Sequence, residues 1–205
     1  GNAIAENRTG SLKLKWEVST KTNFGIDARF FDDKIDMTVD FFHTKTTDIF
    51  QKRANIPDES GLSNVLPYAN IGSMKSWGMD GTLAYTHTFN KDMSLTVRGN
   101  FTHAENEVIY WEQSGVNYPY QSYSGVPYGV QRGMIALGLF KDEDDIKSSP
   151  KQTFMDNYRP GDIKYKDVNG DGKIDNDDVV RLNYSAVPFI QYGFALDWNY
   201  KAFRV

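Results

Sequence analysis

Segments in which apolar and polar residues alternate are the feature that most constrains the fold of this chain. The alternation extends over five stretches, which are residues 23–31, 34–42, 77–89, 93–102 and 190–200. Successive side chains of a β-strand point to opposite faces of a sheet, so a period of two predicts strands with one apolar and one polar face. No stretch shows a long helical period. The chain is therefore predicted to be all-β and antiparallel, with about five strands.

The connections between these strands alternate between short and long. Residues 32–33 and 90–92 are predicted to be tight turns, whereas residues 45–73 and 107–187 form long loops. Outer-membrane barrels have short turns at one end and long external loops at the other, and a strand of about nine to eleven residues crosses the bilayer. The pattern therefore favours a section of a transmembrane β-barrel. By the same parity, residues 201–202 should form another short turn.

A closed barrel needs more strands than this chain supplies, because single-chain bacterial barrels have about eight or more. We therefore expect the 205 residues to be part of a longer barrel. A soluble β-sandwich is the alternative, since its strands show the same alternation when a second sheet covers their apolar face.

The composition excludes several other classes of protein. The 13 Phe, 12 Tyr and 4 Trp exclude a disordered chain. The net charge of −4, without a dense cluster of Lys or Arg, argues against a nucleic-acid-binding protein. No apolar run is long enough for a transmembrane helix, and the lack of Cys excludes disulfides and thiolate metal sites.

Residues 167–178 form the most specific motif in the sequence, because they match the calcium-binding loop of EF-hand proteins. In that loop, oxygens from positions 1, 3, 5, 7, 9 and 12 converge on one ion, and a Gly at position 6 allows the sharp turn. Gly172 occupies position 6 here. The predicted calcium ligands are the side chains of Asp167, Asn169, Asp171, Asp175 and Asp178 and the backbone carbonyl of Lys173.

Two departures from the EF-hand pattern limit what this loop can do. Asp178 replaces the usual Glu at position 12, and its shorter side chain makes bidentate closure of the site harder. Residues 161–165 are predicted to be extended rather than helical, so the loop lacks the paired helices of a calcium sensor. We therefore expect a structural calcium ion that pins an exposed loop. The alternative is an Asn/Asp/Gly-rich turn without metal.

Aromatic residues in the second long loop form another candidate site, for contact with a ligand or a partner. They are Trp111, Tyr118, Tyr120, Tyr123 and Tyr128. Flat rings interleaved with amide side chains suit stacking on a sugar or holding a peptide. The alternative is that they pack the loop onto itself or onto a partner protein. The three His residues are far apart, and no Ser–His–Asp arrangement or phosphate-binding loop is recognisable, so no enzyme is predicted.

A family resemblance rests on residues 14–26, 36–42, 47–49, 70–72, 77–78, 160–175 and 188–200. In this order, these segments resemble the barrel of SusC/RagA-type TonB-dependent transporters of Bacteroidetes. The resemblance implies the C-terminal part of an outer-membrane barrel that imports glycans or peptides and is energised through TonB. It also implies a SusD-like surface lipoprotein as partner, and it places the long loops outside the cell.

The resemblance covers nearly the whole chain, but no plug domain and no TonB box are recognisable. We therefore expect that the chain by itself does not transport. The alternative function is that of a secreted calcium-dependent β-module that binds carbohydrate through the tyrosine-rich loop.

Overall fold

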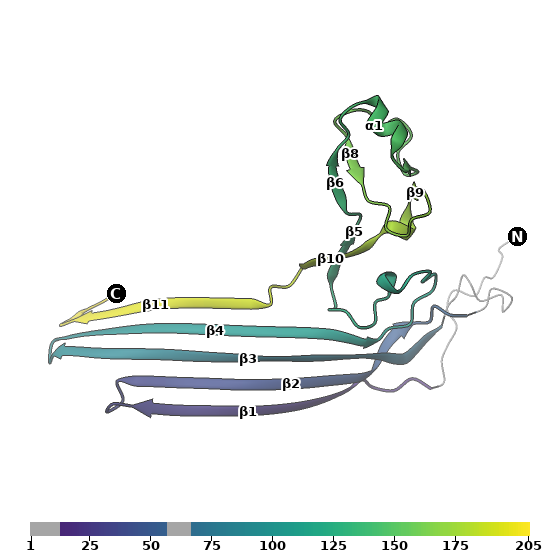
Figure 1. The fold of residues 1–205 in the computed structure, drawn as a ribbon. Coiled ribbons are helices and arrows are strands. Elements are labelled where there is room, and N and C mark those ends of the chain that lie inside the picture. Colours follow the sequence, from purple (N-terminus) through teal and green to yellow (C-terminus); the bar gives the residue numbers. More distant parts are fainter. Residues whose placement is uncertain (1–12, 57–66) are drawn as a thin grey trace, which may run out of the picture. The chain divides into compact units, whose positions relative to one another are not determined.

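The computed structural model describes residues 13–56 and 67–205 (Figure 1). The chain divides into two units. The first contains the chain up to Glu112 together with Ser124–Tyr128 and Val187–Val205, and the second contains Gln113–Tyr123 and Gly129–Ala186. In the described part of the chain, no helix is long and apolar enough to span a membrane.

An antiparallel sheet forms the first unit, with the strand order β1-β2-β3-β4-β11-β12 (Figure 1). Its strands are β1 (Val18–Phe30), β2 (Ile35–Lys52), β3 (Tyr68–Asn90), β4 (Met93–Tyr110), β11 (Ile190–Tyr200) and β12 (Phe203–Arg204). All five predicted strands are present, and β12 follows the predicted short turn at residues 201–202, with Tyr200 opposite Phe203. The prediction of an antiparallel β-structure is therefore confirmed for this unit.

The central strands extend further than the alternation predicts. β2 has 18 residues, β3 has 23 and β4 has 18, whereas about nine to eleven suffice to cross a bilayer. The predicted loop at residues 45–73 is therefore wrong at both ends, because β2 runs to Lys52 and β3 begins at Tyr68. The middle of that loop, residues 57–66, lies outside the described residues.

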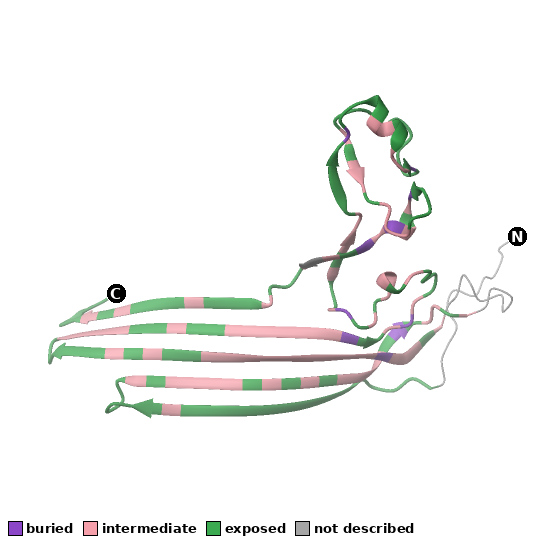
Figure 2. Cartoon of the chain, viewed as in Figure 1, coloured by how far each residue is buried: buried purple, intermediate pink, exposed green. Residues whose placement is uncertain are grey.

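The register between strands gives the sheet one apolar and one polar face. On the apolar face Phe24 lies opposite Phe41, and on the polar face Asp40 lies opposite Asp80. The apolar side chains are open to solvent: Phe24 is 63% and Phe194 is 83% exposed, and Figure 2 shows the strands mostly as exposed or intermediate. The β-sandwich alternative requires a second sheet that covers these side chains. Side chains as exposed as these are not covered in that way.

Beyond the end of β11, β4 pairs with a short segment instead of a strand. The N–H of Val108 donates to the carbonyl of Val126 (2.9 Å), and the N–H of Gly125 donates to the carbonyl of Val108 (2.7 Å). Both valines are buried. The buried carboxylate of Glu112 accepts a hydrogen bond from Arg53 Nε (2.7 Å). This ion pair ties the residues that follow β2 to those that follow β4.

Asn70 closes a bulge between β2 and β3. The pairing of the two strands shifts between Thr46 and Ile49, and Asp48 has a left-handed backbone (φ 58°). The Asn70 amide donates to the carbonyls of Asp48 and Lys15 (2.8 Å each) and accepts from the N–H of Lys15 (3.0 Å). One side chain therefore satisfies one backbone group of the bulge, at Asp48, and two backbone groups of Lys15, which precedes β1.

Gly78 occupies a place where the sheet has no room for a side chain. A Cβ at this position would overlap the carbonyl oxygen of His103 and lie 2.7 Å from Phe42 Cζ, so Gly78→Ala must shift the backbone of β3. We expect this variant to lower the free energy of unfolding by about 1–3 kcal/mol, measured by denaturant titration in detergent. Gly99→Ala is the control, because its nearest neighbour would be 3.9 Å away. Equal losses in the two variants would contradict this account.

Candidate functional site

The second unit shows that most of the predicted long loop is a small folded body. Within the described residues it contains three two-stranded sheets and three short helices. These are β5 (Val130–Gly133) with β10 (Val180–Ser185), β6 (Ala136–Leu139) with β8 (Ile163–Tyr165), β7 (Lys151–Gln152) with β9 (Lys173–Ile174), the α-helix α1 (Glu143–Ser148), and the 3-10 helices η2 (Pro119–Gln121) and η3 (Asn176–Asp178). Phe140 and Ile174 are buried in this unit, and the ring of Phe140 stacks on that of Tyr158 (5.4 Å between centroids).

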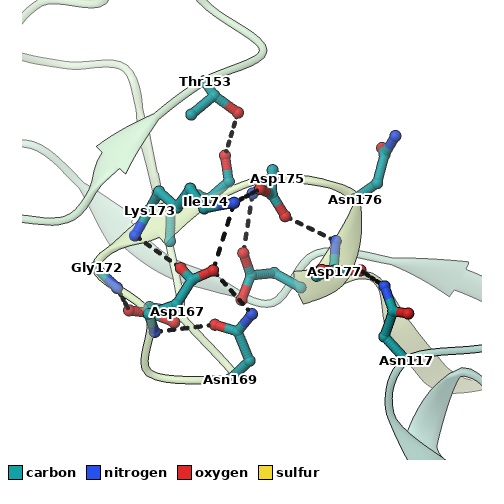
Figure 3. Close-up of polar contacts among 12 residues, drawn as sticks. Asn117, Thr153, Asp167, Asn169, Gly172, Lys173, Ile174, Asp175, Asn176 and Asp177 are labelled. Carbon is teal, nitrogen blue, oxygen red and sulfur yellow. Dashed lines mark hydrogen bonds and ion pairs between the residues drawn. The ribbon is translucent and has the colours of Figure 1, made fainter.

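The calcium-type loop, residues 167–178, begins after β8 and folds around the side chain of Asp167 (Figure 3). Asp167 Oδ1 accepts a hydrogen bond from the N–H of Gly170 (2.6 Å), and Oδ2 accepts one from the N–H of Gly172 (2.9 Å). Both glycines have positive φ (78° and 85°), a conformation that other residues adopt only at a cost. The carboxylate at position 1 therefore points into the loop.

Asn169 and Asp171 continue the same inward turn. Asn169 Oδ1 accepts from the N–H of Asp171 (3.1 Å), and Asp171 Oδ1 accepts from the N–H of Lys173 (3.0 Å). Such local bonds between side chain and backbone are typical of Asx turns, and they form without metal. The structure therefore brings the side chains at positions 1, 3 and 5 together on one turn of the chain.

The ammonium group of Lys173 lies among the carboxylates of the loop (Figure 3). Its Nζ binds the carboxylate of Asp175 and lies 3.5 Å from Asp171 Oδ2. The hydrogen bond to Asp175 raises the pKa of Lys173, and the charge of Asp171 adds to this. The bonds from Lys173 and from the N–H of Asp177 lower the pKa of Asp175. Two of the predicted calcium ligands thus already hold a positive charge from the chain itself.

Asp178, at position 12, is completely buried (0% exposed). Its Oδ1 accepts from the N–H of Val168 (2.7 Å), and its Oδ2 accepts from the N–H of Asp175 (2.9 Å). The second bond belongs to a capping box in which Asp175 caps η3. Asp178 therefore joins the start of the loop to its end. Each of its oxygens has acceptor capacity left, because a carboxylate oxygen carries two lone pairs.

The chemistry of this loop suits a hard cation. All six predicted ligands are oxygens, which calcium prefers to nitrogen or sulfur. The ammonium of Lys173 shows that Asp171 and Asp175 accept a cation between them. In the residues that the structure describes, no three His, Cys, Asp or Glu side chains already converge as a metal site. Calcium would therefore have to displace Lys173 from these carboxylates. The residues before the loop are extended in β8, so the predicted absence of an entering helix is confirmed.

The five aromatic residues of the predicted contact site are divided between the two units. Trp111 and Tyr128 belong to the first unit, where their ring centroids are 6.3 Å apart. Tyr118, Tyr120 and Tyr123 belong to the second unit. Of the five, Tyr123 (42%) and Tyr128 (58%) are the exposed ones. These two remain the ones most open to a ligand.

Tyr118 and Tyr120 pack the long loop onto itself, as the alternative interpretation of the sequence states. Their rings stack in parallel, with 5.3 Å between the centroids. Tyr118 Oη accepts from Asn169 Nδ2 (3.2 Å), and Tyr120 Oη donates to the carbonyl of Asp177 (2.6 Å). Desolvation raises the pKa of Tyr120, and Tyr118 and nearby carboxylates add to this. The two rings therefore support the calcium-type loop.

Asp177 is a structural residue that the loop pattern misses, because position 11 is not a ligand position. Its Oδ1 accepts hydrogen bonds from Asn117 Nδ2 and Gln121 Nε2 (3.2 Å each). These partners are 60 and 56 residues away in the sequence, so no local signal predicts the contacts.

Replacing Asp178 by Ala removes the acceptor of two partly buried N–H groups, those of Val168 and Asp175. We expect Asp178→Ala to lower the free energy of unfolding of the second unit by about 2–4 kcal/mol in calcium-free buffer. Amide hydrogen exchange at Val168 and Asp175 should become faster, and this local measurement checks the cause. Asp144→Ala is the control, because the Asp144 side chain on α1 is 94% exposed. Unchanged exchange at Val168 would contradict the role of Asp178.

Comparison with known proteins places the chain in a family. Residues 1–204 match the family model described as TonB dependent receptor-like, beta-barrel. The chain is 29% identical to TonB-dependent receptor P39 of Formosa agariphila, over 98% of the chain and 22% of that protein. It is 25% identical to TonB-dependent receptor SusC of Bacteroides thetaiotaomicron, over 80% of the chain and 16% of that protein.

Solved structures share the fold. The RagAB peptide importer in its open-open state aligns with a TM-score of 0.70 at 24% identity, over 95% of this chain and 20% of that chain. A structure of the RagAB peptide transporter aligns with a TM-score of 0.67, also at 24% identity, over 94% and 21%. The chain spans about a fifth of the length of these relatives. The resemblance seen in the sequence is confirmed: the chain belongs to the TonB-dependent receptors of the outer membrane, as part of their β-barrel.

Proposed function

We propose that this chain forms part of the wall of an outer-membrane transporter that imports glycans or peptides, with energy supplied through TonB. The match of residues 1–204 to the barrel of TonB-dependent receptors carries this proposal. Because the chain spans about a fifth of its relatives, transport is assigned to the intact parent protein and not to the chain by itself. We assign no catalytic role to the chain.

The apolar face of the large sheet supports a place in the lipid bilayer. Barrel strands alternate lipid-facing and lumen-facing residues, and aromatic girdles flank the apolar band. Near the end of β11, Trp198 stacks on Tyr200 (6.1 Å between centroids). Further along the same face, Lys75 Nζ lies 5.3 Å from the ring centroid of Trp77 and 3.1 Å from Glu107 Oε2. This ion pair supports an end of the apolar band at its level, because paired charges favour water or headgroups over hydrocarbon.

The polar face of the large sheet supports the proposal that this sheet lines a barrel lumen through which polar substrates pass. Thr38 Oγ1 donates to Asp27 Oδ1 (2.8 Å), and Arg29 Nε binds Asp36 Oδ2 (3.2 Å). Hydroxyls and charges of this kind suit both oligosaccharides and peptides.

A SusD-like surface lipoprotein is the proposed partner at the external side. The names of the relatives support the proposed substrates and the proposed partner. One relative is called SusC, and the structural neighbours are RagAB peptide importers.

We further propose that residues 167–178 bind one calcium ion with a structural role. The oxygen-only donor set and the cation accepted by Asp171 and Asp175 support this proposal. The ion would stiffen η3 and, through Asn169, the segment that carries Tyr118. Its ligands would be the side chains of Asp167, Asn169, Asp171, Asp175 and Asp178 and the backbone carbonyl of Lys173.

The parent protein provides the test of transport. We expect the full-length protein to sediment with the outer membrane and to resist extraction by salt, because its apolar face lies in lipid. Deletion of its gene, or of TonB, should abolish uptake of its substrate. A soluble, secreted full-length protein would instead favour the alternative, a calcium-dependent β-module that binds carbohydrate through the tyrosine-rich loop.

Calcium titration tests the proposed ion. In the full-length protein purified in detergent, calcium should raise the midpoint of thermal unfolding, and Asp171→Ala should weaken calcium binding about tenfold or more. Lys173→Met should strengthen calcium binding, because it removes the competing ammonium group. Asp144→Ala, on the exposed side of α1, should behave like the wild type. Flat calorimetric traces for the wild type and for Asp171→Ala alike would remove the calcium assignment.

A further inference from the structure

β5 and β10 form a small two-stranded sheet (Figure 1), and two arginines lie opposite each other in it. The register places Arg132 directly opposite Arg181, so both side chains project from the same face of the sheet. Like charges directly opposite one another destabilise an antiparallel pair. This arrangement is therefore unfavourable by itself, and an anion at this face would relieve it.

No described carboxylate compensates the charge of Arg132. Its Nη1 donates to the carbonyl of Gln121 (2.9 Å) and its Nη2 donates to the carbonyl of Ser122 (2.7 Å). Carbonyl oxygens satisfy these donors but carry no net charge. Arg132 Nε is buried and has no hydrogen-bond partner among the described residues. Arg132 is thus a positive charge that the fold holds in place without neutralising it.

Arg181 is the exposed member of the pair. Its side chain is exposed, and among the residues that the structure describes it forms neither an ion pair nor a hydrogen bond through its guanidinium group. A planar guanidinium presents two parallel N–H groups, which match the two oxygens of a carboxylate. Arg181 is therefore free to bind a ligand that approaches this face.

Tyr123 adds a flat surface to the same region. Its ring centroid is 4.3 Å from the guanidinium carbon of Arg132, a distance that fits a cation–π contact. The ring is still 42% exposed. An apolar group attached to a carboxylate could pack on its open part, beside the charge of Arg132.

We propose that Arg181, Arg132 and Tyr123 form a binding site for a ligand that carries a carboxylate group. Arg181 donates two hydrogen bonds to the carboxylate, Arg132 contributes a fixed positive charge, and Tyr123 packs against the part of the ligand next to it. The free end of a peptide and an acidic sugar both supply this chemistry. The site uses none of the proposed calcium ligands, so variants of its three residues test it separately from the proposed ion.

Calorimetric titration of the full-length protein in detergent tests this site, with N-acetylphenylalanine and its uncharged amide as one pair of probes and galacturonic acid and galactose as another. We expect the charged member of at least one pair to bind and its neutral counterpart not to bind. The pair that responds identifies the source of the carboxylate. Arg181→Gln should weaken binding about tenfold to a hundredfold, because a hydrogen-bonded charge pair is lost.

Arg159→Gln provides the matched control, because Arg159 is an exposed arginine of the same unit that lies outside β5 and β10 and bonds to Asp162 through its backbone N–H. It should bind the probe as the wild type does. Arg181→Lys keeps the charge but loses the planar pair of donors, so it should bind more weakly than the wild type and more tightly than Arg181→Gln. The proposal is overturned if neither charged probe binds, if charged and neutral probes bind equally, or if Arg181→Gln binds like the wild type.

Discussion

The register of the large sheet is the constraint on which the rest of the structure depends. Because side chains alternate with a period of two, a slip of one residue would move every apolar side chain of a strand to the polar face. The short turn between β1 and β2 fixes that register. Phe31, Asp32 and Asp33 all have positive φ there (57°, 53° and 62°), and the N–H of Lys34 donates to the carbonyl of Phe31 (3.3 Å). The backbone strain of these three residues is tolerated because the turn that they form sets the pairing of β1 with β2.

The sequence predicts the strands only where one face is apolar and the other polar. That condition holds around Phe41 and Leu83, and the strands there lie where the alternation places them. It fails in the second half of β2, where residues 44–48 are polar on both faces, so the period of two disappears although the strand continues. The sequence also does not predict that Ser124–Tyr128 pairs with β4, because Val126 is the only buried residue of this segment. Contacts made by the backbone leave no pattern in the side chains.

The calcium-type loop shows the same division between local and distant information. The turn around Asp167 depends on Gly170 and Gly172, which are close in sequence, and the spacing of the motif predicts it. The contact between Tyr120 and Asp177 joins residues 57 positions apart, and nothing near either residue indicates it. The sequence therefore predicts the loop itself, but not what the loop is packed against. It also predicts the aromatic residues as a group, whereas the structure divides them between the two units.

These contacts determine what an ion could contribute. Asp167 and Asp178 already bind backbone N–H groups, and Lys173 already compensates Asp175, so the loop is closed by the chain's own groups. We therefore expect calcium to add stability to a turn that the chain's own hydrogen bonds already close, unlike the metal of a zinc finger, which creates the fold. The added stability would follow the ion's concentration, reaching about 2.7 kcal/mol when calcium is a hundredfold above its dissociation constant. If calcium binds as proposed, we expect the loop to stay folded when calcium is scarce and to become stiffer where calcium is abundant, because the ammonium of Lys173 and the ion would exchange at the same carboxylates.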